Sequence, residues 1–229
     1  MTVSHHDTTA LVTGANGYIA SWLVKYLLEQ GFTVHATVRD KTNQSKVSHL
    51  QTLIDAHPGK LTLFNADLFN EGDFDKSMEG CGLVFHTASP FIIRGLNDPQ
   101  AELIDPALKG TRNVLESVNR TSSVKRVILT SSVVAIYGDY MDMGNTEQGI
   151  FTEAHWNTTS SVKHQPYSYS KTLAEQEAIR IHDAQSRWDM VTVNPGLVLG
   201  PSLAKASDST SLSTMLELMD GTLKTGAPN

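Results

Sequence analysis

The chain has 229 residues and a formal net charge of -6; 40% of its residues are hydrophobic and 18% are charged. This composition excludes a disordered chain, and the single cysteine excludes internal disulfides, which a core of this size does not need. The acidic balance argues against a nucleic-acid binder, no apolar run approaches the ~20 residues that span a bilayer, and the polar start lacks the apolar core of a signal peptide, so we expect a cytoplasmic protein that contacts no membrane.

Short runs rich in β-branched and aromatic residues recur along the chain and predict buried strands. These runs are residues 9–13, 32–38, 61–64, 83–86, 126–130 and 190–193. Helical patterns lie between most of them, which is typical of a parallel sheet with helices on both faces. We therefore expect an α/β fold with a doubly wound parallel sheet of the Rossmann type.

Apolar residues at helical spacing predict where the main helices lie. Ile19, Leu23 and Leu27 repeat every four residues and predict one apolar face. Gly31 follows this stretch, and glycine often comes just after the last turn of a helix. Two more helices are expected, over residues 104–118 and from Pro166 onward.

A glycine-rich turn follows the first predicted strand. Gly14, Gly17 and Ala20 have the spacing that lets a backbone approach a pyrophosphate and a helix pack closely on a strand. The free N–H groups at the start of the helix would then face the anion. The turn predicts a dinucleotide site, and the alternative is an ordinary glycine turn. The residues expected to bind the cofactor here are Gly14, Asn16, Gly17, Tyr18 and Ile19.

The end of the second predicted strand indicates which dinucleotide binds. An NAD site usually has an acidic residue about 20 residues after the glycine turn, where it binds the ribose 2′-hydroxyl. Here Arg39 holds that place and Asp40 comes one position late, so a 2′-phosphate would meet a guanidinium. Lys46 would add a second positive charge. We therefore expect NADP(H) rather than NAD(H), and a solvated charged turn is the alternative.

Later strand ends supply further candidates, because the carboxyl ends of parallel strands share one edge of the sheet. Asp67 would accept a hydrogen bond from the adenine amino group, or it would cap a turn instead. Small residues after the fourth strand would let a cofactor lie across the backbone. The candidates at these strand ends are Asp67, Leu68, Thr87, Ala88, Ser89 and Thr130.

Tyr167 and Lys171 are predicted to be a catalytic pair. They are four residues apart and therefore share a helix face. The Lys171 ammonium should lower the pKa of the phenol, so that Tyr167 protonates a carbonyl oxygen while hydride arrives from a nicotinamide. Ser132 is preferred over Ser131 as a donor to that oxygen, since it lies farther beyond the fifth strand. A surface pair is the alternative for the Tyr–Lys motif alone.

Together these motifs resemble the extended short-chain dehydrogenase/reductase family, of the NAD-dependent epimerase/dehydratase type, and most closely its dihydroflavonol-reductase-like branch. The stretches that carry the resemblance are residues 12–20, 36–40, 84–90, 129–132, 167–175 and 194–201. The resemblance implies Ser132, Tyr167 and Lys171 as a catalytic triad and a homodimer formed through the long helices. It also implies a nicotinamide lined by Pro195, Gly196, Leu197 and Val198.

The resemblance also divides the chain at about residue 200. Residues 1–200 are expected to form an NAD(P)-binding domain with the catalytic residues. Residues 201–229 are expected to begin a substrate-binding lobe that looks truncated, because family members usually continue further. Lys109, Gly110 and Thr111 stand where many members have a catalytic asparagine, so that role is not assigned. Tyr140, Met141 and Met143 follow the fifth strand in a long segment that runs to Thr152, and they are further candidates for substrate contact.

We expect an NADP(H)-dependent oxidoreductase that reduces a small-molecule carbonyl, an aldehyde or a ketone, to an alcohol. The alternatives are an NAD-dependent nucleotide-sugar epimerase or dehydratase, which Arg39 disfavours, and a non-catalytic dinucleotide-binding protein, which the triad disfavours. The nine histidines lack the spacing of metal ligands, so no metal site is expected. Cys81 is expected to pack as a small apolar residue.

Overall fold

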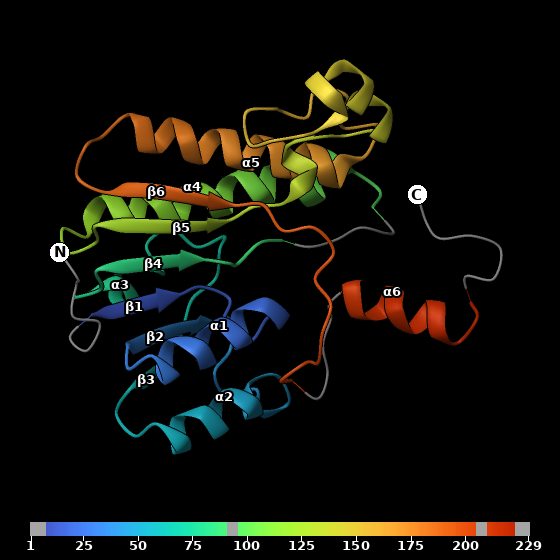
Figure 1. Cartoon of the computed structure of the whole chain (residues 1–229). Helices are drawn as coiled ribbons and strands as arrows, with labels where there is room; N and C mark the ends of the chain where they lie inside the picture. Colours follow the sequence, from blue (N-terminus) through green and yellow to red (C-terminus); the bar gives the residue numbers. More distant parts are fainter. Residues whose placement is uncertain (1–7, 91–95, 205–209, 223–229) are drawn as a thin grey trace.

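The computed structural model describes residues 8–90, 96–204 and 210–222. Six parallel strands form one sheet in the order β3-β2-β1-β4-β5-β6 (Figure 1). The strands are β1 (Thr9–Val12), β2 (Thr33–Val38), β3 (Leu61–Asn65), β4 (Leu83–His86), β5 (Arg126–Thr130) and β6 (Asp189–Val193). Each lies within one residue of a predicted run at either end. The predictions succeed because strands buried on both faces read as near-continuous apolar runs.

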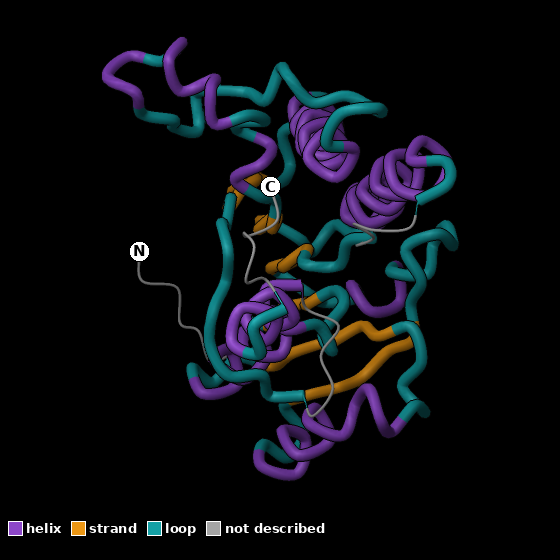
Figure 2. The backbone as a smooth tube through the Cα atoms, turned by 90° about the vertical axis from the view of Figure 1, so that its right-hand side faces the viewer, coloured by secondary structure: helices purple, strands orange, loops and turns teal. Residues whose placement is uncertain are grey.

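Helices cover both faces of this sheet (Figures 1 and 2). One face carries α1 (Tyr18–Glu29) and α2 (Gln44–Ala56), and the other carries α3 (Asp75–Met78), α4 (Asp105–Arg120) and α5 (Pro166–Asp183). Val24 of α1 and Val34 of β2 belong to the buried cluster on the first face. Val114 of α4 and Val127 of β5 belong to the cluster on the second face. The predicted doubly wound α/β fold is confirmed.

The helices agree with the sequence prediction at two ends, and they differ at one end and in one buried face. Pro166 begins α5, and Gly31 follows α1 with a φ of +86°, both as predicted. The helix predicted from residue 104 begins earlier, as a π-helical turn, η2 (Gln100–Ile104), that runs directly into α4. The inner stripe of α1 does not include Ile19, which is 38% exposed because the first turn of α1 projects beyond the strands.

The connection from β5 to α5 is irregular and contains three 3-10 turns. These are η3 (Val133–Ala135), η4 (Tyr140–Asn145) and η5 (Glu147–Gly149). Buried Asn157 holds the segment to η3: its backbone N–H donates to the carbonyl of Ala135 (2.9 Å) and its Nδ2 donates to that of Val134 (2.8 Å). Hydrogen bonds from side chains replace regular secondary structure in this part of the chain.

The sheet is least covered at its β6 edge. Val191 is 46% exposed and Val193 is 48% exposed, and both lie on the outermost strand. The last helix, α6 (Thr210–Met219), lies beyond the carboxyl ends of the strands rather than against this edge (Figure 1). The predicted site residues gather at the carboxyl edge of the sheet, where α1 and α5 begin.

Candidate active site

The glycine turn brings the ends of β1 and β4 into contact. Gly14 has a φ of +63°, a backbone conformation that side chains disfavour. A Cβ atom built on Gly14 would lie 3.0 Å from the Cα atom of Ala88, so the position also excludes a side chain on steric grounds. Gly17 immediately precedes α1 and is exposed, which leaves the first N–H groups of that helix accessible to an anion.

Thr13 connects the same two strand ends through its hydroxyl group. Thr13 Oγ1 accepts hydrogen bonds from the backbone N–H groups of Thr87 (3.1 Å) and Ala88 (3.0 Å). Its own proton is then free to be donated to His86 Nδ1, which lies 3.0 Å away. Burial, followed by the charge of Lys171, lowers the pKa of His86 to about 4, so this ring is neutral near pH 7.

A segment that we call the strap, residues 194–201, runs from the end of β6 to the start of α1 (Figure 1). Two side chains of α1 hold its far end. The Tyr18 hydroxyl donates to the carbonyl oxygen of Gly200 (2.8 Å), and Trp22 Nε1 donates to that of Pro201 (2.8 Å). The predicted nicotinamide residues 195–198 all belong to the strap. Tyr18, predicted to bind the cofactor, therefore also anchors the segment that contains them.

Two charged residues, Arg39 and Asp40, follow β2, and Asp40 is held by hydrogen bonds within the turn. Arg39 and Asp40 are both exposed. The Asp40 carboxylate accepts hydrogen bonds from the backbone N–H (2.8 Å) and the hydroxyl (2.6 Å) of Thr42, and these bonds lower its pKa. Asp40 is thus engaged in a turn, while Lys46 lies in the first turn of the neighbouring α2. Arg39 follows β2 directly, and Lys46 comes seven residues later in the chain.

Asp67 and Leu68 follow β3 and are held by local contacts. Asp67 Oδ1 accepts a hydrogen bond from the backbone N–H of Phe69 (2.9 Å), which is the turn-capping arrangement given above as its alternative. Leu68 packs against α4, since a Cβ atom on Gly110 would lie 3.3 Å from Leu68 Cβ. Asn113 of α4 is buried and donates to the Leu68 carbonyl (2.6 Å), so this asparagine supports the β3 end.

Tyr167 and Lys171 lie together at the start of α5. Lys171 Nζ is 5.7 Å from the centre of the Tyr167 ring, so the predicted shared helix face is confirmed. Nζ also donates a hydrogen bond to Ser89 Oγ (2.9 Å), which connects α5 to the end of β4. Thr130, at the end of β5, lines a small cavity of about 20 Å³ together with Ser89 and Lys171. The predicted residues of β4, β5 and α5 therefore meet at one edge.

The direction predicted for the Tyr167 pKa is wrong for this structure. Burial raises the pKa of Tyr167 to about 12, and burial also lowers the pKa of Lys171 to about 8. Both shifts have the same cause, because loss of water penalises the charged form of each group. The phenol therefore holds its proton over the neutral pH range, and the ammonium beside it loses its proton more readily than an ordinary lysine does.

Ser131 and Ser132 differ in the partners of their hydroxyl groups. Ser131 is buried, and its Oγ donates to the carboxylate of Glu175. Ser132 is only partly buried and begins η3, where its Oγ accepts a long hydrogen bond of 3.4 Å from the N–H of Val134. The Ser132 hydroxyl can thus still donate its proton, which agrees with the preference for Ser132, while its catalytic role stays a prediction.

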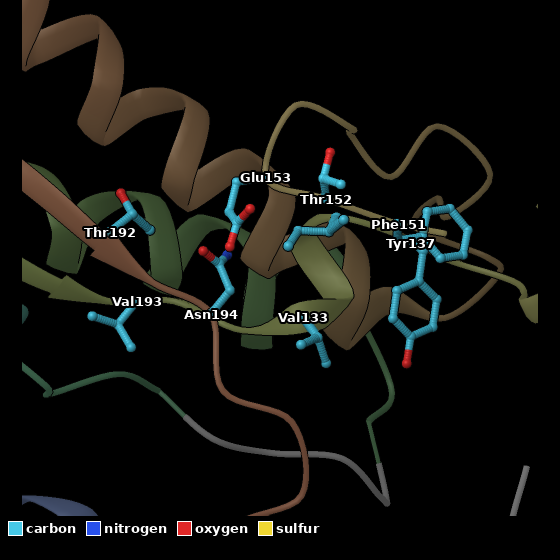
Figure 3. Close-up of a pocket in the computed structure, with 9 residues that line it drawn as sticks. Val133, Tyr137, Phe151, Thr152, Glu153, Thr192, Val193 and Asn194 are labelled. Carbon is cyan, nitrogen blue, oxygen red and sulfur yellow. The ribbon is translucent and has the colours of Figure 1, made fainter. Parts of the chain in front are cut away.

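A cavity of about 600 Å³ was not expected from the sequence (Figure 3). Val133, the residue after Ser132, helps to line it, whereas Ser132, Tyr167 and Lys171 are not among its lining residues. The cavity lies between the end of β6, η3 and the segment around Phe151. The rings of Tyr137 and Phe151 stack at its far end with their centres 5.0 Å apart. The residues that line it are Val133, Ile136, Tyr137, Phe151, Thr152, Glu153, Thr192, Val193 and Asn194. Tyr140, Met141 and Met143, the residues expected to contact a substrate, are exposed and are not among the residues that line this cavity.

Three buried polar residues of this edge were also missed: Thr13, His86 and Glu175. Glu175 continues the four-residue spacing of Tyr167 and Lys171, so the sequence contains a signal for it. Thr13 and His86 are hydrogen-bonded to each other but lie 73 residues apart in the chain, so no local pattern reveals this pair.

Two further findings concern the part of the chain that the structure describes. No group of three or more His, Cys, Asp or Glu side chains is placed to hold a metal ion there. None of the helices in the same residues has both the length and the apolar character to cross a membrane.

Cys81 is fully buried, and burial raises the pKa of its thiol to about 12. It packs in the core on the α4 face, as predicted.

A family model matches most of the chain. It is described as the NAD dependent epimerase/dehydratase family and covers residues 10–222. A cinnamoyl-CoA reductase from Medicago truncatula is 46% identical over 226 residues, which are 96% of this chain and 67% of that protein. A tetraketide alpha-pyrone reductase from Arabidopsis thaliana is 43% identical over 92% of this chain and 63% of that protein.

Solved structures give the same result for the fold. Yeast methylglyoxal/isovaleraldehyde reductase in complex with NADPH superposes with a TM-score of 0.80 and 29% identity, over 93% of this chain and 66% of that one. Vestitone reductase from alfalfa gives a TM-score of 0.73 and 31% identity, over 92% of this chain and 63% of that one. The chain thus spans 63–67% of the length of the four relatives described here.

Proposed function

The chain belongs to the NAD dependent epimerase/dehydratase family, and we propose that it reduces an aldehyde or ketone to an alcohol with NADP(H). One continuous set of contacts carries this proposal. Gly14 of the glycine turn is packed on Ala88, and the adjacent Ser89 accepts the hydrogen bond from Lys171, which lies over the ring of Tyr167. A dinucleotide bound at the turn would therefore extend toward the phenol.

In this proposal the residues of the protein donate a proton and orient the substrate. Bound NADPH would supply the hydride that adds to the carbonyl carbon. Tyr167 donates its hydroxyl proton to the carbonyl oxygen, and Ser132 donates a hydrogen bond to the same oxygen. The phenolate left on Tyr167 is stabilised by the Lys171 ammonium and regains its proton from solvent. The raised pKa of Tyr167 keeps the proton in place until the carbonyl oxygen gains charge.

The NADP(H) preference rests on the corner after β2. Arg39 would bind a 2′-phosphate through its guanidinium, and Lys46 would add charge from α2. Asp40 Oδ1 accepts two hydrogen bonds from Thr42, which hold this carboxylate in a turn one residue beyond the position that Arg39 occupies. The yeast and alfalfa relatives are described as reductases, and the yeast structure contains NADPH, which also supports the proposal.

We propose that part of the substrate lies in the cavity that Val133, the residue after Ser132, helps to line. Its walls combine the stacked rings of Tyr137 and Phe151 with Val133, and Thr192 and Val193 lie at the end opposite the rings (Figure 3). A volume of about 600 Å³ is in the range of cavities that hold small organic molecules. We propose a carbonyl compound with an aromatic or branched apolar group as the substrate class.

The test is the loss of NADPH absorbance with a panel of aldehydes and ketones. We expect turnover with NADPH, a kcat/KM for NADH about 10- to 100-fold lower, and loss of this difference in Arg39→Ala, because one charge-assisted contact is removed. Tightly bound NAD that needs no external cofactor would instead indicate an epimerase or dehydratase. Binding of NADPH without turnover of any carbonyl would indicate a dinucleotide-binding protein.

A further inference from the structure

Glu175 is a buried carboxylate next to the proposed catalytic pair. It lies one helical turn beyond Lys171, so Tyr167, Lys171 and Glu175 form one row along α5. Only 8% of Glu175 is exposed. Burying a carboxylate costs free energy unless hydrogen bonds compensate it, so the partners of this group show what holds it there.

The carboxylate joins the ends of two strands to α5. Glu175 Oε2 accepts hydrogen bonds from Ser131 Oγ, at the end of β5, and from Asn194 Nδ2, at the end of β6 (2.9 Å). Asn194 Nδ2 also donates to the carbonyl oxygen of Ser132 (3.1 Å). A single oxygen atom thus receives one donor from each strand end.

Both strand ends lead directly to proposed functional residues. Ser131 precedes Ser132, and Asn194 precedes Pro195 of the strap. Backbone hydrogen bonds already tie these two segments to each other. The Ser131 N–H donates to the carbonyl oxygen of Val193 (2.8 Å), and the Val133 N–H donates to that of Pro195 (3.0 Å). What the backbone does not fix is the position of this pair of segments relative to α5, where Tyr167 lies.

We propose that Glu175 is a positioning residue, whose Oε2 atom fixes Ser132 and the strap relative to Tyr167 and Lys171. The inference rests on the proposed reduction. In this role Glu175 acts as a hydrogen-bond acceptor and takes no part in the transfer of the hydride or the proton. Because displacement of a reacting group by about 1 Å can lower a rate by about 100-fold, the effect of losing this acceptor should fall on kcat.

The experiment compares Glu175→Ala with Glu175→Gln, which keeps an acceptor oxygen at the same place. We expect Glu175→Ala to lower kcat by about 10- to 100-fold with little change in the Kd for NADPH, and Glu175→Gln to stay within about fivefold of the unaltered protein. Glu177 of the same helix offers a matched control, since it is 8% exposed but pairs with Arg112 and Arg180 instead. Glu177→Ala should leave kcat per folded molecule unchanged.

A second measurement does not depend on activity. Hydrogen exchange of the amides at 131–133 and 194–196 should become faster in Glu175→Ala and stay unchanged in Glu177→Ala. If Glu175→Ala fails to fold, Ser131→Ala and Asn194→Ala each remove one donor and should show the same local increase. Unchanged exchange at both segments, or a Glu175→Gln variant as slow as Glu175→Ala, would overturn the proposal. A wild-type protein that binds NADPH but reduces no carbonyl would contradict the proposed function, and the exchange data would still test Glu175.

Discussion

At Tyr167, burial and a neighbouring ammonium act on the phenol in opposite directions. The spacing of Tyr167 and Lys171 in the sequence predicts their proximity, and the structure places Nζ 5.7 Å from the ring centre. The spacing contains no information on how much water each group loses. Burial decides the outcome and moves both pKa values toward the neutral forms, to about 12 for Tyr167 and about 8 for Lys171.

The lowered pKa of Lys171 predicts a specific pH dependence. The ammonium form stabilises the Tyr167 phenolate that forms during reduction, and this form is lost as the pH rises through about 8. We expect kcat/KM for carbonyl reduction to be constant below that pH and to fall above it. Lys171→Arg keeps its charge over this range, so its residual activity should not fall near pH 8. A wild-type pH–rate profile that stays flat to pH 10 would contradict the role of Lys171.

Gly14 offers a second test at the scale of one residue. Gly14→Ala places a methyl group 3.0 Å from Ala88, at a φ of +63°. Gly59→Ala is a matched control, because its φ is +74° and nothing lies within 4 Å of its Cβ position. We expect urea unfolding to show a loss of about 1 kcal/mol for Gly59→Ala and at least ~1 kcal/mol more for Gly14→Ala. Only Gly14→Ala should also weaken NADPH binding; equal losses in the two variants would contradict a close-contact role.

At the scale of elements, α1 does more than begin at the glycine turn. Tyr18 and Trp22 hold the far end of the strap, whose near end is tied to η3 through the hydrogen bond from the Val133 N–H to the Pro195 carbonyl. The strap is therefore fixed at both ends across the edge where the strands end. This arrangement links the glycine turn to the predicted nicotinamide residues through two side chains of one helix.

The strap anchor predicts an effect of Trp22→Phe on cofactor affinity. The substitution removes the hydrogen bond to Pro201 and keeps an aromatic ring on α1. Loss of one such bond should raise the Kd for NADPH by about three- to tenfold, measured by fluorescence titration. Tyr26→Phe, on the same helix and 55% exposed, should leave the Kd unchanged. Equal Kd values for all three proteins would show that the anchor has no part in binding.

The elements differ in how well the sequence predicts them. The six strands are predicted well because a strand between two helical layers must be apolar throughout. The connection 133–165 is not predicted, because it is held by contacts such as those of Asn157 rather than by a repeating pattern. For the same reason the cavity walls at Tyr137 and Phe151 were not anticipated, although the catalytic candidates beside them were.

At the scale of the whole molecule, the stability should depend on His86. This ring is buried and neutral, with a pKa of about 4, whereas an ordinary histidine has a value of 6.5. As the pH falls from 6.5 to about 4, the unfolded chain gains a proton that the folded protein does not, so the folded state loses about 3 kcal/mol of stability. Urea unfolding at several pH values should show this loss. His86→Gln should reduce the change in unfolding free energy per pH unit between pH 6.5 and about 4. A wild-type stability that is constant from pH 6.5 to 4 would show that His86 is not held neutral.

The fold class, the sheet and the family follow from the sequence, because the glycine turn, the apolar strands and the Tyr–Lys spacing are local patterns. The long-range polar contacts do not. Glu175 reaches Ser131 across 44 residues, and Thr13 reaches His86 across 73. Such contacts form only after the strands have paired in the observed order, so a linear pattern cannot contain them.

The proposed reduction depends on Tyr167 as the source of the proton. Its most direct test is NADPH-dependent carbonyl reduction by Tyr167→Phe, with Tyr169→Phe, two residues further along α5, as the matched control. We predict that Tyr167→Phe binds NADPH as tightly as the wild type but loses about 100- to 10,000-fold in kcat, while Tyr169→Phe keeps its rate. Wild-type turnover by Tyr167→Phe would contradict the account.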